Sequence, residues 1–201
     1  MAGDTVRLKG TAYRLEKKIG ESHVSTVWSV AGDPRVLVKL VRPDFKGDSH
    51  YGMEVEALGA LVHTGIPHAR LKAASPDGLV MVKEFVDGET LQTHMDRGGV
   101  HPSRMSGLAA LAGWLIAIGY TADLAPANLV HDSWFGKWTL VDAGGFKPGP
   151  PLSVVEQLWK EELFGPDPAK AGAAKQRFLT NLRTRLGPAS LSWKELIRNA
   201  G

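Results

Sequence analysis

The hydrophobic pattern of the chain changes near residue 88, and this change limits the folds that the chain can adopt. Between residues 13 and 87, short runs of β-branched and aromatic residues alternate with turns that contain glycine, proline or aspartate. Such runs are typical of antiparallel strands, and only residues 52–65 show helical spacing among them. After residue 88 the apolar spacing is mostly helical. The sequence therefore predicts an α+β chain with a β-rich first part and a helical second part.

The second part is expected to contain several helices and one small hairpin. Two short strands are predicted at 128–131 and 138–142, around a turn that contains Gly136. The expected helices are 89–97, a long apolar helix capped by Ser103 and including 105–122, one that begins at Ser153 with Glu156 as its capping-box partner, one at about 168–186, and one that begins at Ser192 with Glu195.

Composition excludes several classes of site. The chain has no cysteine, so disulfides and thiolate metal sites are ruled out, and its seven histidines form no zinc-ligand pattern. A formal charge of +3 gives little reason to expect nucleic acid as a partner. Residues 105–122 carry no charge, but three glycines favour a buried helix over a membrane span. The first residues lack an apolar signal-peptide core, which predicts a cytosolic protein.

Lys39 and Glu54 are the first pair with a candidate chemical role. Lys39 lies at the end of the β-branched run "VLVK", and Glu54 follows 15 residues later on the expected helix. A helical glutamate that faces a strand lysine fixes the ammonium group, which can then bind phosphate oxygens. Glu56 points about 200° away from Glu54 on a helix, so only one of the two can face Lys39. Glu54 shares its face with Leu58 and Leu61 and is the favoured partner.

Asp123, Asn128 and Asp142 surround the predicted hairpin. Each alone is most simply read as a turn or cap residue. The order along the chain changes this interpretation, because it runs strand lysine, helix glutamate, extended segment, apolar helix, D-x-x-x-x-N, hairpin and D-x-G.

In this order the chain resembles the protein-kinase fold from about residue 13 to residue 200. "IGESHVSTVWSV" looks like the glycine-rich loop, "VLVKL" like the strand with the phosphate-binding lysine, and "MEVEALGALVHTGI" like the αC helix. "MVKEFVDGETL" looks like the hinge, "DLAPANLV" like the catalytic loop and "LVDAGGF" like the D-F-G segment. The resemblance implies one bilobal kinase-like domain over 1–201, with a β-rich N-lobe to about 83, a hinge at 84–88 and a truncated helical C-lobe at 89–201.

The resemblance also implies a role for each matching residue, with ATP and Mg²⁺ as ligands. Asp123 would accept the proton of the substrate hydroxyl, and Asn128 and Asp142 would hold Mg²⁺. Lys39, paired with Glu54, would hold the α- and β-phosphates. The remaining nucleotide contacts would come from Gly20, Ser22 and Val27 near the loop, and from the backbone of Glu84 and Val86 at the hinge.

Several positions depart from the family pattern. Ser22 and Ser25 stand where the second and third loop glycines would be, although serine can still offer backbone N–H groups to a phosphate. Ala122 replaces the arginine that normally pairs with a phosphorylated activation loop, and only "GFKPGPPL" separates the D-x-G from the next expected helix. Activity is therefore expected to be independent of activation-loop phosphorylation. Ala125 replaces a catalytic-loop lysine, which favours low activity or a pseudokinase.

The short second lobe resembles that of the minimal kinases that bacterial pathogens inject into host cells, namely OspG-type effectors and the HopBF family. This resemblance implies a monomeric protein Ser/Thr kinase delivered to the host cytosol, with a protein partner such as Hsp90 or a ubiquitin-conjugating enzyme. Two other functions stay open. A pseudokinase would use the fold only for binding, and a small-molecule phosphotransferase of the aminoglycoside or choline kinase type would carry similar acidic motifs. The latter class usually has a histidine before the catalytic aspartate and a large substrate lobe, and both are missing here.

Overall fold

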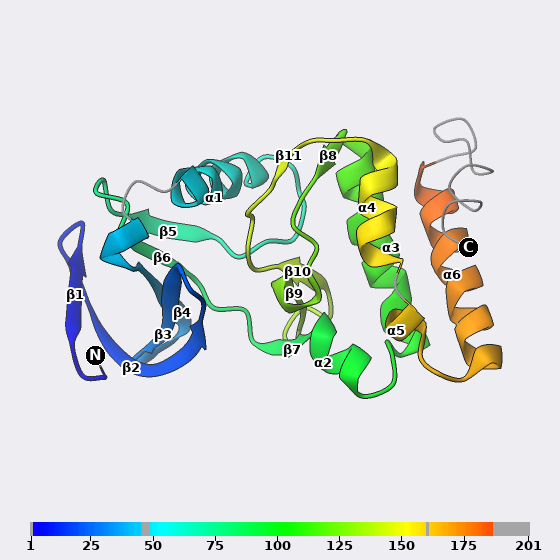
Figure 1. The fold of residues 1–201 in the computed structure, drawn as a ribbon, viewed down its shortest axis with the longest axis horizontal. Coiled ribbons are helices and arrows are strands. Elements are labelled where there is room, and N and C mark those ends of the chain that lie inside the picture. Colours follow the sequence, from blue (N-terminus) through cyan, green and yellow to red (C-terminus); the bar gives the residue numbers. More distant parts are fainter. Residues whose placement is uncertain (1, 46–48, 160, 187–201) are drawn as a thin grey trace. The chain divides into compact units, whose positions relative to one another are not determined.

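The computed structural model describes residues 2–45, 49–159 and 161–186 of the 201-residue chain. The chain divides into two compact units. Unit 1 comprises Met1–His63 and Ala69–Val86, and unit 2 comprises Thr64–His68 and Asp87–Gly201. Figure 1 shows the strands of unit 1 in blue and cyan and the helices of unit 2 in green to orange.

Unit 1 is built on a six-stranded antiparallel sheet with the order β1-β2-β3-β4-β6-β5. Its strands are β1 (Thr5–Leu8), β2 (Thr11–Glu21), β3 (Ser25–Val30), β4 (Asp33–Val41), β5 (Leu71–Ala74) and β6 (Val80–Glu84). Valine-rich alternation explains β3, β4 and β6, because β-branched side chains pack well on a pleated surface. One face of the sheet forms an apolar core that includes Leu15, Trp28, Val38 and Val82.

Helix α1 (Ser49–Leu61) belongs to unit 1 and contacts β5. Its buried positions are Glu54, Ala57, Leu58 and Leu61, which recur at helical spacing. The hydroxyl of Tyr51 lies 2.8 Å from the carbonyl oxygen of Val80 and so ties α1 to β6. Helix and sheet therefore meet through an apolar face that contains one buried carboxylate.

Unit 2 contains two small antiparallel sheets, with the orders β10-β9-β7 and β11-β8. The strands are β7 (Gly88–Thr90), β8 (Tyr120–Thr121), β9 (Leu129–Asp132), β10 (Trp138–Leu140) and β11 (Lys147–Pro148). The helices are α2 (Leu91–Asp96), α3 (Pro102–Ala117), α4 (Pro151–Leu158), α5 (Glu161–Phe164) and α6 (Pro168–Leu186). Two short 3-10 turns, η1 (Pro43–Phe45) in unit 1 and η2 (Pro126–Asn128) in unit 2, complete the fold.

Helix α3 is the centre of unit 2. Its buried side chains include Met105, Leu108, Leu111 and Leu115, and it packs against α6 and α4. The indole N–H of Trp138 donates to the Arg104 carbonyl at 2.9 Å and joins the β9–β10 hairpin to this helix. None of the helices in the described part of the chain has both the length and the apolar character that a membrane crossing requires.

The α+β prediction is confirmed, whereas several predicted element ends are wrong. Pro102 occupies the first turn of α3 and His101 caps it, so Ser103 is not the cap. The helix ends at Ala117 rather than at residue 122. Pro150 precedes α4, and Ser153 already lies inside that helix. Glu89 lies in β7 instead of a helix, and the predicted helix at Ser192 falls outside the described residues.

Candidate active site

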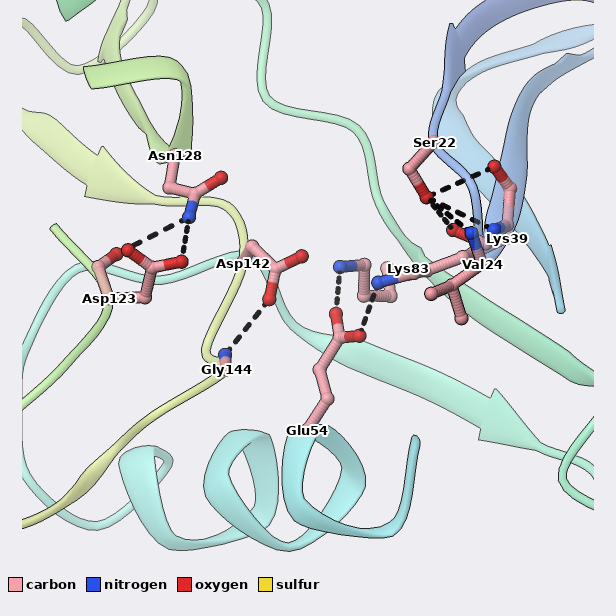
Figure 2. A network of polar contacts seen from close by, with 10 residues as sticks. Ser22, Val24, Lys39, Glu54, Lys83, Asp123, Asn128, Asp142 and Gly144 are labelled. Carbon is pink, nitrogen blue, oxygen red and sulfur yellow. Dashed lines mark hydrogen bonds and ion pairs between the residues drawn. The ribbon is translucent and has the colours of Figure 1, made fainter. Parts of the chain in front are cut away.

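In unit 1, one carboxylate is shared by two lysines. The Nζ of Lys39 donates to Glu54 Oε2 at 2.5 Å, and the Nζ of Lys83 donates to Glu54 Oε1 at 2.5 Å. Figure 2 shows Glu54 rising from α1 toward both ammonium groups. We call these three residues the Glu54 cluster. The predicted choice of Glu54 over Glu56 agrees with this pairing, because Glu56 is exposed.

The strand register explains why both lysines reach the same carboxylate. Lys39 pairs with Met81 across β4 and β6, and Lys83 lies two residues further along β6. Opposite residues and residues two apart share a face of an antiparallel pair. Val38 and Val82 alternate with them and enter the apolar core on the other face. Lys83 was missed at the sequence level, although the alternation "VMVK" places it on the face of Met81.

The predicted nucleotide contacts in β2 and β3 lie on the face that carries Lys39. Val27 pairs with Lys39 across β3 and β4, and Gly20 pairs with Val27 across β2 and β3. A Cβ at Gly20 would stand 3.5 Å from Val27, which is ordinary contact, so the glycine is not forced by space. These three positions therefore line one surface of the sheet.

The turn between β2 and β3 differs from the prediction for a phosphate-binding loop. The Ser22 hydroxyl accepts hydrogen bonds from the backbone N–H groups of Val24, at 3.2 Å, and of Ser25, at 3.1 Å. The N–H of Ser22 itself donates to the Ser25 carbonyl at 2.8 Å. One side-chain oxygen therefore occupies the N–H groups of both Val24 and Ser25 in this structure (Figure 2), and the expected contact of the serine N–H groups with a phosphate stays a prediction.

The predicted hinge begins at the end of β6. The N–H of Glu84 donates to the Arg70 carbonyl at 2.8 Å, and the N–H of Phe85 donates to the Arg35 carbonyl at 2.9 Å. These donors hold the segment against its neighbours in the sheet. The nucleotide-binding roles of Glu84 and Val86 stay predictions.

In unit 2, Asp123 is held by four hydrogen bonds, one of them from Asn128 Nδ2 to its backbone carbonyl at 3.4 Å. Its Oδ1 accepts from the N–H of Ala125 at 3.1 Å, and its Oδ2 accepts from Asn128 Nδ2 at 3.0 Å. Its own N–H donates to the Gly144 carbonyl at 2.9 Å. The carboxylate is thus fixed in direction by the short turn η2 and stays exposed.

Asp142 follows β10 and lies close to Asp123 and Asn128 within unit 2. Its Oδ1 accepts from the N–H of Gly144 at 2.9 Å, and the N–H of Val141 donates to the Asn128 carbonyl at 2.9 Å. Gly145 has a φ of +72°, a backbone conformation in which a side chain would be strained, and a Cβ there would point toward Asp123. Ala143, the middle residue of the segment that resembles D-F-G, is fully buried.

Asn128 and Asp142 are suited to Mg²⁺ by donor type. Asn128 donates to Asp123 through Nδ2, which turns its carbonyl oxygen toward other partners, and Asp142 supplies a carboxylate. Mg²⁺ takes oxygen ligands and usually binds through one or two protein groups together with phosphates. The described residues contain no cluster of three or more His, Cys, Asp or Glu with metal-site geometry, so a metal here would depend on such a mixed set.

Gln157 is a further residue that the sequence did not reveal. Its Oε1 accepts from the N–H of Leu124 at 3.0 Å, and its Nε2 donates to Thr121 Oγ1 at 3.1 Å. One side-chain amide on α4 thus forms hydrogen bonds with the chain on both sides of Asp123. No sequence signal points to it, since the contact joins segments 33 and 36 residues apart.

Comparison with solved structures shows that the fold is similar to that of kinase domains. Two double mutants of the PknI kinase domain of Mycobacterium tuberculosis match with a TM-score of 0.60 each. One is 17% identical, with 93% of this chain and 99% of that chain covered, and the other is 18% identical, with 100% and 99% covered. A single mutant of that domain matches at 15% identity and a TM-score of 0.56, with 93% and 99% covered.

No protein-family model and no curated protein matches the sequence. At these identities the likeness to solved structures concerns the fold. The chain therefore has a protein-kinase fold of the α+β class, with a β-rich first unit and a reduced helical second unit.

Proposed function

We propose that the protein is a small ATP- and Mg²⁺-dependent protein Ser/Thr kinase. The observation that carries the proposal is the Lys39–Glu54 ion pair on the sheet of a kinase fold, because a lysine fixed by a helical glutamate is the arrangement that holds ATP phosphates in this fold. Asp123, Asn128 and Asp142 supply the remaining groups that phosphoryl transfer needs.

Each of these site residues has one role in the proposed reaction. The oxygen of a substrate hydroxyl attacks the γ-phosphorus of ATP, the bond from that phosphorus to the β,γ-bridging oxygen breaks, and ADP leaves. Asp123 accepts the hydroxyl proton, for which its two hydrogen bonds set the direction of the carboxylate. Lys39 neutralises phosphate charge. Bound Mg²⁺, held by Asn128 and Asp142, would supply further charge neutralisation.

The segment after Asp142 supports activity without a phosphorylated loop. Strand β11 pairs with β8, which ends two residues before Asp123, and the N–H of Gly149 donates to the Gly119 carbonyl at 3.0 Å. The rings of Tyr120 and Phe146 stack with their centroids 4.7 Å apart. Hydrogen bonds and stacking of this kind order the segment without a phosphate group. The protein substrate, a host location and a role as an effector follow from the resemblance to minimal kinases and are part of the proposal.

A pseudokinase is the second candidate, and two observations favour it. The Ser22 hydroxyl satisfies two of the backbone donors that a phosphate would use, and Ala125 gives no positive charge near the transferred group. Binding of Mg·ATP without transfer would fit this candidate.

The deciding experiment uses γ-labelled ATP with Mg²⁺, the purified chain and a cell extract. The kinase proposal expects a labelled protein band with the wild type and at least a hundredfold less label with Asp123→Ala, since general-base catalysis contributes about 10²–10⁴-fold. Asp132→Ala is the control, because this aspartate caps the β9–β10 turn and is not one of the predicted site residues. Absence of any labelled band, with Mg·ATP binding intact, would overturn the protein-kinase proposal and leave a pseudokinase or a small-molecule phosphotransferase.

A further inference from the structure

The Glu54 cluster contains one more cation than phosphate binding by Lys39 requires. Each lysine contacts its own oxygen of the carboxylate, so Lys39 and Lys83 do not compete for one acceptor. Lys83 lies at the end of β6, directly before the predicted hinge residue Glu84. The proposed function gives Lys83 no task.

Exposure separates the two lysines. The side chain of Lys39 is 17% exposed, whereas that of Lys83 is 5% exposed and that of Glu54 is 4% exposed. A ligand can therefore reach Lys39 more readily than Lys83. A buried ammonium group is strongly destabilising without a carboxylate beside it, so Lys83 and Glu54 hold one another in place.

The consequence concerns what happens when Lys39 turns to a phosphate. If Lys39 were the sole partner of Glu54, its movement would leave a buried carboxylate with a weakened contact and loosen α1. Lys83 contacts the second oxygen of Glu54. This contact would hold α1 on β6 when Lys39 moves.

We propose that Lys83 is a positioning residue that fixes Glu54, and through it α1 and the Lys39 ammonium group, in the arrangement that binds phosphate. The test by nucleotide binding rests on the proposed function, whereas the test by the stability of α1 depends on the ion pair alone. Lys83 acts through Glu54 and does not itself touch the nucleotide.

The first test measures the dissociation constant of Mg·ATP by calorimetry for the wild type, Lys83→Met, Lys39→Met and the double variant. Lys83→Met is expected to weaken binding about tenfold when Lys39 is present and to have almost no effect in the Lys39→Met background, because coupled neighbours are non-additive. Lys72→Met, which changes an exposed lysine on β5, is the matched control and is expected to bind like the wild type. Equal losses in both backgrounds would overturn the proposal, since Lys83 would then act on the nucleotide independently of Lys39.

The second test needs no nucleotide. Amide hydrogen exchange of α1 is expected to stay close to the wild type in Lys39→Met, because Lys83 retains Glu54, and to rise about tenfold in Lys83→Met. If Lys83→Met does not fold, Lys39→Met alone still decides. Loss of α1 protection in Lys39→Met would overturn the proposal. A wild-type protein that binds no Mg·ATP but shows the expected exchange pattern would contradict the proposed function and leave the role of Lys83 standing.

Discussion

At the scale of single residues, Ser22 has the most direct effect on the predicted phosphate-binding turn. Its hydroxyl accepts from the N–H groups of Val24 and Ser25, two donors that a phosphate would use in the proposed nucleotide site. A nucleotide must displace this oxygen before it can use the same donors. We expect Ser22→Ala to bind Mg·ATP about fivefold more tightly, since a hydrogen bond of this type contributes about 1 kcal/mol.

Calorimetric titration of Ser22→Ala with Mg·ATP measures this effect. Ser29→Ala is the control, because Ser29 lies in the neighbouring strand and contacts the N–H of Lys17 instead of the turn. Unchanged or weaker binding by Ser22→Ala would mean that the hydroxyl shapes the turn for the nucleotide instead of blocking it.

Gln157 is a second residue to test, because its substitution should change the position of Asp123. Gln157→Leu removes both the acceptor for Leu124 and the donor to Thr121, so we expect kcat to fall about tenfold to hundredfold, because a misplacement of about 1 Å at a reacting group can cost about 10²-fold in rate. Gln157→Glu keeps an acceptor for the Leu124 N–H and is expected to retain more activity than Gln157→Leu.

Steady-state kinetics separate this role from a general loss of stability. KM for ATP should stay close to the wild type in Gln157→Leu, because the amide holds the chain beside Asp123, and the proposal assigns Asp123 to the substrate hydroxyl and not to ATP. Gln92→Leu, which breaks an exposed contact with Asp96 on α2, provides the control. A rise in KM with unchanged kcat would be inconsistent with positioning of Asp123.

At the scale of elements, the proposed kinase activity gives the pairing of β8 with β11 the ordering role that a phosphorylated loop has in regulated kinases. We expect phosphatase treatment to leave kcat/KM unchanged, and Phe146→Ala to lower kcat several-fold, because a stacked aromatic pair contributes about 0.5–1.5 kcal/mol. Phe135→Ala removes a ring that is 74% exposed on the β9–β10 turn and should have no such effect. A large drop in activity after phosphatase treatment would contradict independence from phosphorylation.

Elements with strong local signals were predictable, and those that depend on distant contacts were not. The strands β3, β4 and β6 follow from β-branched alternation, and α6 follows from its long helical pattern. The start of α3 was misjudged because Pro102 at the first turn moves the cap to His101. Strand β7 is three residues long and pairs with β9, and strand β11 is two residues long and pairs with β8. No local sequence pattern predicts these pairings.

The same division applies to the candidate site. Lys39, Glu54, Asp123, Asn128 and Asp142 could be named from spacing and order, and the ion pair between the first two is present. Lys83, Gln157 and the Ser22 cap could not be read from the sequence, because each depends on strand register or on a side-chain contact across the fold. The assigned roles of the predicted residues remain predictions.

At the scale of the whole molecule, stability should depend on pH through a histidine cluster in unit 2. Burial lowers the pKa of His94, and the neighbouring Arg104 guanidinium, 2.8 Å from Nε2, lowers it further. Burial and Arg104 also lower the pKa of His131, whose ring lies 6.4 Å from that of His94. Glu89, with Oε2 3.6 Å from His94 Nε2, opposes the shift.

The sign of the effect follows from proton uptake. Both histidines have a lower pKa in the folded chain, so below about pH 6.5 the unfolded chain binds more protons and the free energy of unfolding falls. Above that pH the stability is fully present. Urea unfolding between pH 7.5 and pH 5 measures the slope, and His94→Gln, which can still accept from Arg104, should reduce it. His63→Gln, at an exposed position after α1, is expected to keep the wild-type slope. An identical slope in His94→Gln would exclude His94 as a source of the pH dependence, because the remaining titration would then arise elsewhere in the chain.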